Sequence, residues 1–289
     1  MYINVLKDDY NIFKGADWPS FVELSKLDNL NDYPTFVIEE INNITSIDQF
    51  EKQTCGNLLS QHRYLANNEL KYKFNLSNTI DRNYSRSWQD LFVLSVLDGK
   101  TNGFFLEIGA NDPIAYSNTY LLESKFGYTG ISIDIDGDYR TLWDTYRSAS
   151  FVEQDALTID YSQLLKQNDA PKIIDYLQLD IEPGDNTFAA LKLIPFDEYQ
   201  FQTITFETEL FRGNIDVREQ SREYLINLGY MLVSKDVAMY LNPFWVLYED
   251  WYVHNSVSSK FVNDILLSYQ PATAEKTTLA YRNFLKNVL

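Results

Sequence analysis

Five short apolar runs in the middle of this chain are each followed by an acidic residue. The gaps between successive acids are 27, 21, 25 and 27 residues, and the acids are Glu107, Asp134, Asp155, Asp180 and Glu207. Such gaps fit one strand plus one helix, and alternating strands and helices predict a parallel sheet with helical crossovers. Ligands of these sheets bind outside the carboxyl ends of the strands. We therefore expect an acidic edge that suits hydroxyls, amines or positive charge and suits a bare polyphosphate badly.

The residue pattern predicts where the elements of this sheet lie. Strands are expected at 104–106, 130–133, 151–152, 176–179 and 204–206. Crossover helices are expected at 118–126, 138–147, 161–167, 186–193 and 217–228. Two later runs, 230–234 and 244–248, have no helix between them and are expected to pair as a hairpin. The predicted fold class is α/β, with a mostly parallel sheet that ends in a C-terminal antiparallel hairpin. This differs from the plain dinucleotide-binding arrangement.

The chain divides into three regions. Residues 1–84 show no clear strand series and several short helical patterns, so we expect a mostly helical N-terminal cap or extension. Residues 85–258 carry the strand and helix series. Residues 259–289 have helical patterning and are expected to form a C-terminal helical extension. The sequence leaves open what the two outer regions do and which oligomeric state the protein adopts.

Charge and composition limit the partners. With 24 basic against 41 acidic residues the net charge is −17, so neither duplex nucleic acid nor an anionic membrane surface is expected as a partner. The single cysteine, Cys55, excludes an internal disulfide and suits a reducing compartment. The N-terminus lacks the basic and apolar segments of a signal peptide, and no apolar run is long enough to span a membrane. We therefore expect a cytoplasmic protein.

The segment 105–112 is a predicted strand followed by a turn of small residues. Gly109 lets the chain turn sharply and lets a ligand approach the backbone, and Glu107 stands at the end of the strand. The dinucleotide fingerprint needs three glycines at fixed spacing, and only Gly109 is present here, which counts against a cofactor with a pyrophosphate. The alternative reading is a tight turn that binds no ligand.

Two further acids stand where α/β nucleotide sites contact a nucleoside. Asp134 follows the second strand, where an acid holds ribose hydroxyls and repels a 2′-phosphate. Asp155, followed by Ala156, comes after the third strand and can accept a hydrogen bond from an exocyclic amine such as that of adenine. Asp134 and Asp136 also form an Asp-x-Asp pattern, which is a metal motif of nucleotide-sugar transferases.

Taken in order, these motifs resemble the S-adenosylmethionine-dependent methyltransferases of the FkbM family. The likeness runs from about Ser87 to His254. The segments that carry it are 89–93, 105–112, 117–119, 130–134, 155–156, 175–182, 204–207 and 248–254. The resemblance implies a class I, Rossmann-like methyltransferase fold with a seven-stranded sheet, and S-adenosylmethionine as the cofactor.

The resemblance also implies roles for individual residues. The group beside the methionine part of the cofactor comprises Glu107, Gly109, Ala110 and Asn111. Asp134 would lie on the ribose, and Asp155 with Ala156 on the adenine. The chain departs from the family pattern at two places. Residues 111–113 replace a further glycine that often follows Gly109, and Pro183 intervenes before Gly184.

The acceptor is expected near the end of the fourth strand. Methyl transfer is an in-line displacement that depends on orientation, and a hydroxyl nucleophile also benefits from a base. Asp180, Glu182 and His254 are the candidate bases or orienting groups, and each could instead be a solvated or capping residue. Together with Glu207 they have the chemistry of a magnesium or manganese site. Because spacing in sequence says nothing about distance, we do not assign a metal.

The sequence therefore predicts an S-adenosylmethionine-dependent O-methyltransferase. By the resemblance, the acceptor is a hydroxyl on a sugar, glycan or other small molecule. One alternative is a metal-dependent nucleotide-sugar transferase that uses Asp134 and Asp136. Another is a non-catalytic interaction or assembly protein that retains the fold.

Overall fold

A seven-stranded sheet forms the centre of the molecule. The computed structural model describes residues 70, 72–80, 82–212, 214–241 and 244–263. The strands are β1 Phe104–Ile108, β2 Thr129–Asp134, β3 Ser150–Glu153, β4 Ile173–Leu179, β5 Gln200–Glu207, β6 Tyr230–Leu241 and β7 Phe244–His254. Most of the expected cap over residues 1–84 and of the extension over 259–289 lies outside the described residues, so both stay predictions.

Along the chain, α4 precedes β1, and the other α-helices connect successive strands from β1 to β6. The α-helices are α4 Gln89–Val96, α5 Tyr120–Phe126, α6 Arg140–Tyr146, α7 Tyr161–Gln167, α8 Gly184–Leu193 and α9 Ile215–Asn227. Short 3-10 turns are η5 Ser77–Thr79, η6 Gly137–Tyr139, η7 Ala156–Thr158 and η8 Leu210–Arg212. Each predicted crossover helix is present; α7 has the predicted bounds, and the ends of the others differ by at most two residues.

The strand order is β3-β2-β1-β4-β5-β7-β6. Strands β1 to β5 are parallel, and β7 pairs antiparallel with both β5 and β6. The predicted mixed sheet with its C-terminal hairpin is confirmed, and this is the class I, Rossmann-like arrangement. Because β2 and β4 lie on opposite sides of β1, the strand order reverses at β1. Sheets of this kind bind ligands beside that reversal, at the carboxyl ends of the strands.

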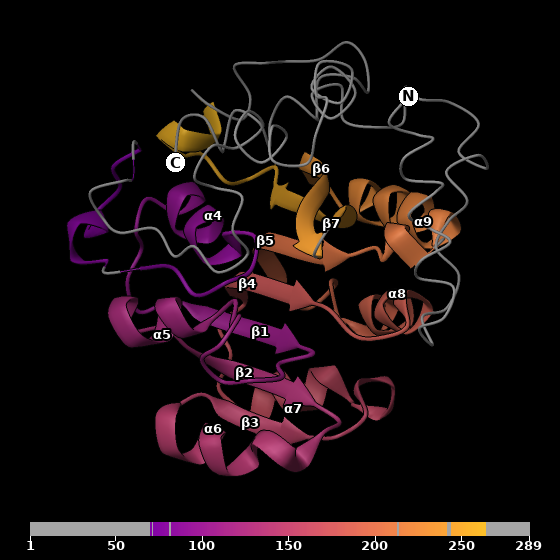
Figure 1. Ribbon diagram of the computed structural model, residues 1–289, viewed down its shortest axis with the longest axis horizontal. Helices are drawn as coiled ribbons and strands as arrows, with labels where there is room; N and C mark the ends of the chain where they lie inside the picture. Colours follow the sequence, from indigo (N-terminus) through magenta and orange to yellow (C-terminus); the bar gives the residue numbers. More distant parts are fainter. Residues whose placement is uncertain (1–69, 71, 81, 213, 242–243, 264–289) are drawn as a thin grey trace.

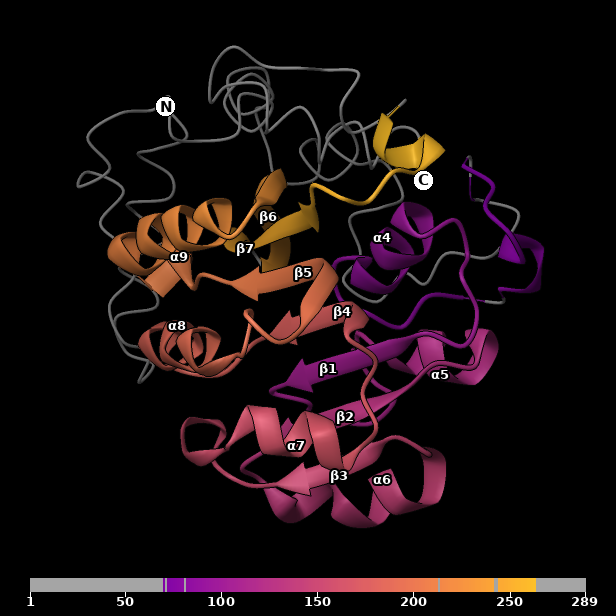
Figure 2. The same cartoon turned by 180° about the vertical axis from the view of Figure 1, so that it is seen from behind.

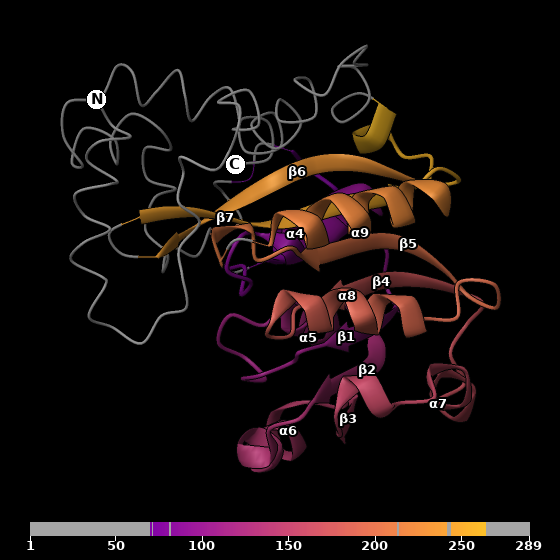
Figure 3. The ribbon, with the colours of Figure 1, turned by 90° about the vertical axis from the view of Figure 1, so that its right-hand side faces the viewer.

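Helices cover both faces of the sheet. Figure 1 shows α4, α5 and α6 on the near side, and Figure 2 shows α7, α8 and α9 on the other. Viewed from the side, α8 and α9 lie along the strands β4 to β6 (Figure 3). Burial on both faces explains why every residue of β1 is apolar except Glu107, and why every one is buried. Phe105 packs toward α4 and α5, while Leu106 packs toward α7 and α8.

Candidate active site

The turn after β1 is held tightly between its two neighbouring strands. The N–H groups of Gly109 and Ala110 donate to the carbonyl of Ile133 at 2.9 and 3.0 Å, and the N–H of Asp180 donates to Ile108 at 2.9 Å. Gly109 has a φ of +87°, and a Cβ at this position would lie 1.7 Å from the carbonyl oxygen of Asp180. Only glycine fits here, so the turn after β1 can pack directly against the carbonyl of Asp180.

Asp134 joins the two loops that border this turn. One carboxylate oxygen accepts the N–H of Asn111 at 2.8 Å and the other accepts the N–H of Asp136 at 2.9 Å. The carbonyl of Asn111 in turn accepts the indole N–H of Trp143 at 2.9 Å. Asp134 is only partly buried. Because each carboxylate oxygen has two lone pairs, both oxygens can accept a further hydrogen bond from a ligand.

Asp155 lies beyond the end of β3, on the same edge of the sheet. Its carboxylate accepts the N–H of Leu157 at 2.9 Å and so caps η7. Ala156 is buried, and its carbonyl accepts the hydroxyl of Tyr161 at 2.9 Å. These bonds fix the loop that would face the base of a nucleoside. They do not test the predicted contact with adenine.

Glu107 is an interior residue rather than an exposed one. One of its oxygens accepts the hydroxyls of Thr119 at 2.8 Å and Ser132 at 2.7 Å, and its side chain is 1% exposed. Burial raises the pKa of Glu107, and the guanidinium of Arg147 opposes that rise. Glu107 thereby ties the start of α5 to β2. Its predicted contact with a cofactor stays a prediction.

Three carboxyl groups gather near the carboxyl ends of β4 and β5, where the middle of β7 passes, and we call them the acidic cluster: Asp180, Glu207 and Glu249. Glu207 and Glu249 stand directly opposite each other in the antiparallel pair. The carboxyl group of Asp180 lies beside that of Glu207. Burial, then the charge of Asp180, raise the pKa of Glu207 well above its usual range. Burial is also the main reason that the pKa of Glu249 rises to about 8.

Helix α4 holds the third member of the cluster in place. The side-chain amide of Gln89 donates to one oxygen of Glu249 at 2.7 Å, and the indole N–H of Trp251 donates to the other at 2.6 Å. The sequence motifs included Gln89 and Glu249 but gave neither a role. The missing information was the register of β7 against β5, which the residue pattern does not contain.

Glu182 is exposed and lies beside a basic residue that the sequence did not single out. Arg212 contacts Glu182 at 2.6 Å and Glu209 at 3.1 Å. Glu209 also accepts the N–H of Gly184 at the start of α8. The loop after β4 is therefore tied to the loop after β5. Glu182 stays a predicted orienting group, aimed in part by Arg212.

The prediction that His254 follows the last strand and faces the crevice is wrong. His254 is the final residue of β7 and pairs with Tyr230, at the start of β6. Because β7 runs antiparallel to β5, its end lies where the parallel strands begin, on the edge of the sheet opposite the acidic cluster. There its ring nitrogen contacts the hydroxyl of Ser256 at 2.8 Å. His254 is thus not placed to act on an acceptor in the crevice.

Two further properties concern the described part of the chain. Within it, no group of three His, Cys, Asp or Glu side chains is arranged to hold a metal ion. None of its helices combines the length and the apolar character needed to cross a membrane.

No family model and no curated protein matches this chain. Among solved structures it is similar to a precorrin-6y C5,15-methyltransferase from Geobacter metallireducens, at 14% identity over 57% of this chain and 87% of that chain, with a TM-score of 0.36. Dnmt2 methyltransferase of S. pombe matches at 15% identity over 60% of this chain and 56% of that chain, with a TM-score of 0.38. TYW2 of M. jannaschii, solved in complex with AdoMet, matches at 14% identity, 59% and 78% coverage and a TM-score of 0.35. Similarity at this level carries no argument about activity.

Proposed function

We propose that this protein is an S-adenosylmethionine-dependent methyltransferase. The observation that carries the proposal is the pairing of the Gly109 turn with Asp134 at the point where the strand order reverses. Gly109 lets the chain turn tightly against the carbonyl of Asp180 at the end of β1, and Asp134 beside it has lone pairs for two ribose hydroxyls. The single glycine favours a nucleoside without a pyrophosphate, as S-adenosylmethionine is. Asp155 and Ala156 would border its adenine.

The cofactor supplies the methyl group, and the residues of the chain hold and orient the acceptor. Asp180 lies at the end of β4 next to the Gly109 turn, so it is the best-placed group to accept a proton from an acceptor. Glu182, held by Arg212, would orient that acceptor. We propose a hydroxyl on a sugar, glycan or other small molecule as the methylated group. The acidic edge argues against a highly anionic acceptor, and with it against nucleic acid.

Calorimetric titration with S-adenosylhomocysteine tests the proposal. The intact protein should bind it, and Asp134→Ala should weaken binding by at least about tenfold, because a charge-assisted hydrogen bond contributes roughly 1.5–3 kcal/mol. Asp136→Ala is the matched control. Asp136 is exposed, and its side chain accepts the N–H of Asp138 at 2.9 Å. The Asp136→Ala variant removes one carboxylate two residues from Asp134 and should leave the binding of S-adenosylhomocysteine unchanged.

Two results would overturn the proposal. One is the absence of S-adenosylhomocysteine binding by the folded, intact protein. The other is manganese-dependent binding of uridine diphosphate that is lost in both Asp134→Ala and Asp136→Ala. The second result would favour the nucleotide-sugar transferase instead.

A further inference from the structure

We propose that Asp180 and Glu207 of the acidic cluster bind a protonated amine on the acceptor substrate. The inference rests on the proposed function, because the amine would belong to the molecule that is methylated. It narrows the acceptor from hydroxyl compounds in general to those that also carry an ammonium group, such as an amino sugar.

The carboxyl group at the end of β5 contains a hydrogen-bond acceptor that has no donor. Glu207 is 6% exposed, and its Oε2 atom has no hydrogen-bond partner. Leaving a buried polar atom without a partner costs roughly 1–3 kcal/mol, and more for a charged group. An incoming donor would remove that cost. Asp180, which directly follows the adjacent strand β4, is only partly buried, so this member of the pair is accessible.

The charged groups around Asp180 and Glu207 are mostly acidic. The groups that act most strongly on Glu207 are Asp180, Glu209 and Glu249, all acidic. The nearby cation, Arg212, attracts Glu207 but is in direct contact with Glu182 and Glu209. The surroundings of Glu207 therefore favour either a proton on its carboxyl group or a bound cation beside it.

The chemistry of the two carboxyl groups indicates which kind of cation they can bind. An ammonium group has three donors and no acceptor, so it matches oxygens that only accept. A neutral hydroxyl brings one donor and no charge. A metal ion would need a set of ligands that converge on one point, and the described residues contain no such group of three His, Cys, Asp or Glu side chains. The two carboxyl groups therefore suit an ammonium better than a metal ion or a hydroxyl.

Binding should release a proton. Burial and the charge of Asp180 raise the pKa of Glu207, so its carboxyl group holds a proton more readily than a free glutamate does. When an ammonium group binds, it keeps its own protons, and a proton held by Glu207 passes to the solvent. The two carboxylates then face the positive charge directly. No covalent bond to carbon changes in this step.

The test is calorimetry on the full chain with glucosamine as the probe, and with glucose and N-acetylglucosamine as uncharged comparisons. Each sugar is titrated with and without saturating S-adenosylhomocysteine, in two buffers that differ in ionisation enthalpy. We expect glucosamine to bind at least about tenfold more tightly than either neutral sugar. We also expect glucosamine binding to release protons, because the bound ammonium group favours the ionised form of Glu207. The proton measurement uses the unaltered protein, so it does not depend on a variant that folds.

Variants locate the effect. Glu207→Gln removes a buried negative charge with little change of shape and should weaken glucosamine binding at least about tenfold, a loss typical of a charged hydrogen bond. Asp185→Asn is the matched control, since Asp185 is exposed in the first turn of α8 and should not matter. Binding of S-adenosylhomocysteine should stay the same in both variants.

Several results would overturn the inference. These are equal binding of charged and neutral sugars, glucosamine binding without proton release, or glucosamine binding that Glu207→Gln does not change. Loss of S-adenosylhomocysteine binding in Glu207→Gln would show instead that the pair holds the ammonium of the cofactor. If the unaltered protein fails to bind S-adenosylhomocysteine, the proposed function is lost. If it binds that compound but shows no preference for glucosamine, only this inference is lost.

Discussion

At the scale of single residues, Gly109 couples the stability of the fold to the site. Its φ of +87° and the 1.7 Å that would separate a Cβ from the carbonyl of Asp180 leave no room for alanine. We expect Gly109→Ala to lower the free energy of unfolding by more than the roughly 1–3 kcal/mol that strain at a special backbone position costs, because the collision adds to that strain. We also expect it to abolish S-adenosylhomocysteine binding. Urea denaturation and calorimetry measure the two effects.

Gly127→Ala separates strain in φ from collision. Gly127 ends α5 with a φ of +67°, and an added Cβ would meet only the side-chain oxygen of Asn102, at 3.0 Å. This variant should cost roughly 1–2 kcal/mol, the price of a left-handed backbone, and should leave ligand binding unchanged. Equal losses of stability in the two variants would contradict the argument from the Asp180 carbonyl.

Glu249 should make the stability depend on pH. Burial raises its pKa to about 8, whereas the unfolded chain releases the proton near pH 4.5. The folded state therefore holds a proton that the unfolded state has lost. The resulting stability is fully present below about pH 4.5 and is lost as the pH rises through about 8. We expect the urea concentration at the midpoint of unfolding to decrease as the pH is raised from 6 to 9.

In Glu249→Gln that fall should be smaller, because the substituted side chain does not titrate. The informative quantity is the slope of the unfolding midpoint against pH. The absolute stability also changes, since an amide cannot accept from both Gln89 and Trp251 as the carboxylate does. A slope that is identical in the two proteins would show that other groups cause the pH dependence.

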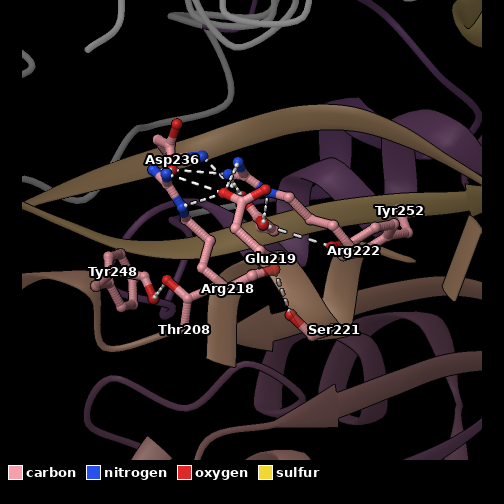
Figure 4. A network of polar contacts seen from close by, with 9 residues as sticks. Thr208, Arg218, Glu219, Ser221, Arg222, Asp236, Tyr248 and Tyr252 are labelled. Carbon is pink, nitrogen blue, oxygen red and sulfur yellow. Dashed lines mark hydrogen bonds and ion pairs between the residues drawn. The ribbon is translucent and has the colours of Figure 1, made fainter. Parts of the chain in front are cut away.

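At the scale of elements, a buried network of ion pairs fastens α9 to the C-terminal hairpin (Figure 4). Arg222 donates twice to Asp250, at 2.7 and 2.9 Å, and once to Asp236, at 2.7 Å. Arg218 adds a contact of 3.2 Å to Asp236. Arg222→Ala would leave two buried carboxylates short of a partner. We expect it to lower the free energy of unfolding by roughly 3–5 kcal/mol, measured by urea denaturation.

The exposed rim of the same network provides the control. Glu219 contacts Arg218 at 2.9 Å, and its side chain is 57% exposed. Because exposed ion pairs contribute little, Glu219→Ala should cost no more than about 1 kcal/mol. A loss in Arg222→Ala as small as that in Glu219→Ala would mean that water reaches the two aspartates and that the network does not fasten the hairpin.

The sequence predicted the elements well where apolar runs were unbroken, and poorly where a buried charge interrupted them. Helix α7 lies where it was expected. Strand β4 begins three residues earlier than expected, because the buried Asp175 within it is satisfied by the N–H of Phe104 at 2.9 Å and by Lys100 at 2.6 Å. Strand β6 continues beyond residue 234 through Lys235 and Asp236, since Arg218 and Arg222 both pair with one carboxylate oxygen of Asp236. Such charges read as loop in a sequence.

At the scale of the whole molecule, topology decided what the sequence could say about the site. Parallel order alone puts the acids at or just beyond the carboxyl ends of β2 to β5 along one edge, so that edge could be predicted. The placement of Glu249 and of His254 depends on the register of an antiparallel strand and on its length. The residue pattern fixes neither. Nor does it show which acids turn inward, as Glu107 does toward Ser132.

The net charge of −17 is a property of the whole chain and should be visible in its response to salt. Self-repulsion destabilises a compact chain whose charge is far from zero. Raising the ionic strength from 0.01 M to 0.15 M shortens the screening length from about 30 to about 8 Å and so weakens that repulsion. The attractions of Arg222 are buried and are screened much less. Repulsion should therefore weaken more than attraction.

We expect the melting temperature to rise over this range of salt. A gain of about 1 kcal/mol would raise it by roughly 2–4 °C for a domain of this size. Differential scanning calorimetry in sodium chloride measures the shift, and a parallel series in potassium chloride should give the same curve, since screening does not depend on the identity of the ion. A melting temperature that falls with salt would show that exposed ion pairs outweigh the excess of acidic residues. It would also weaken the case that the acidic edge attracts a cationic acceptor, because that attraction draws on the same uncompensated charge.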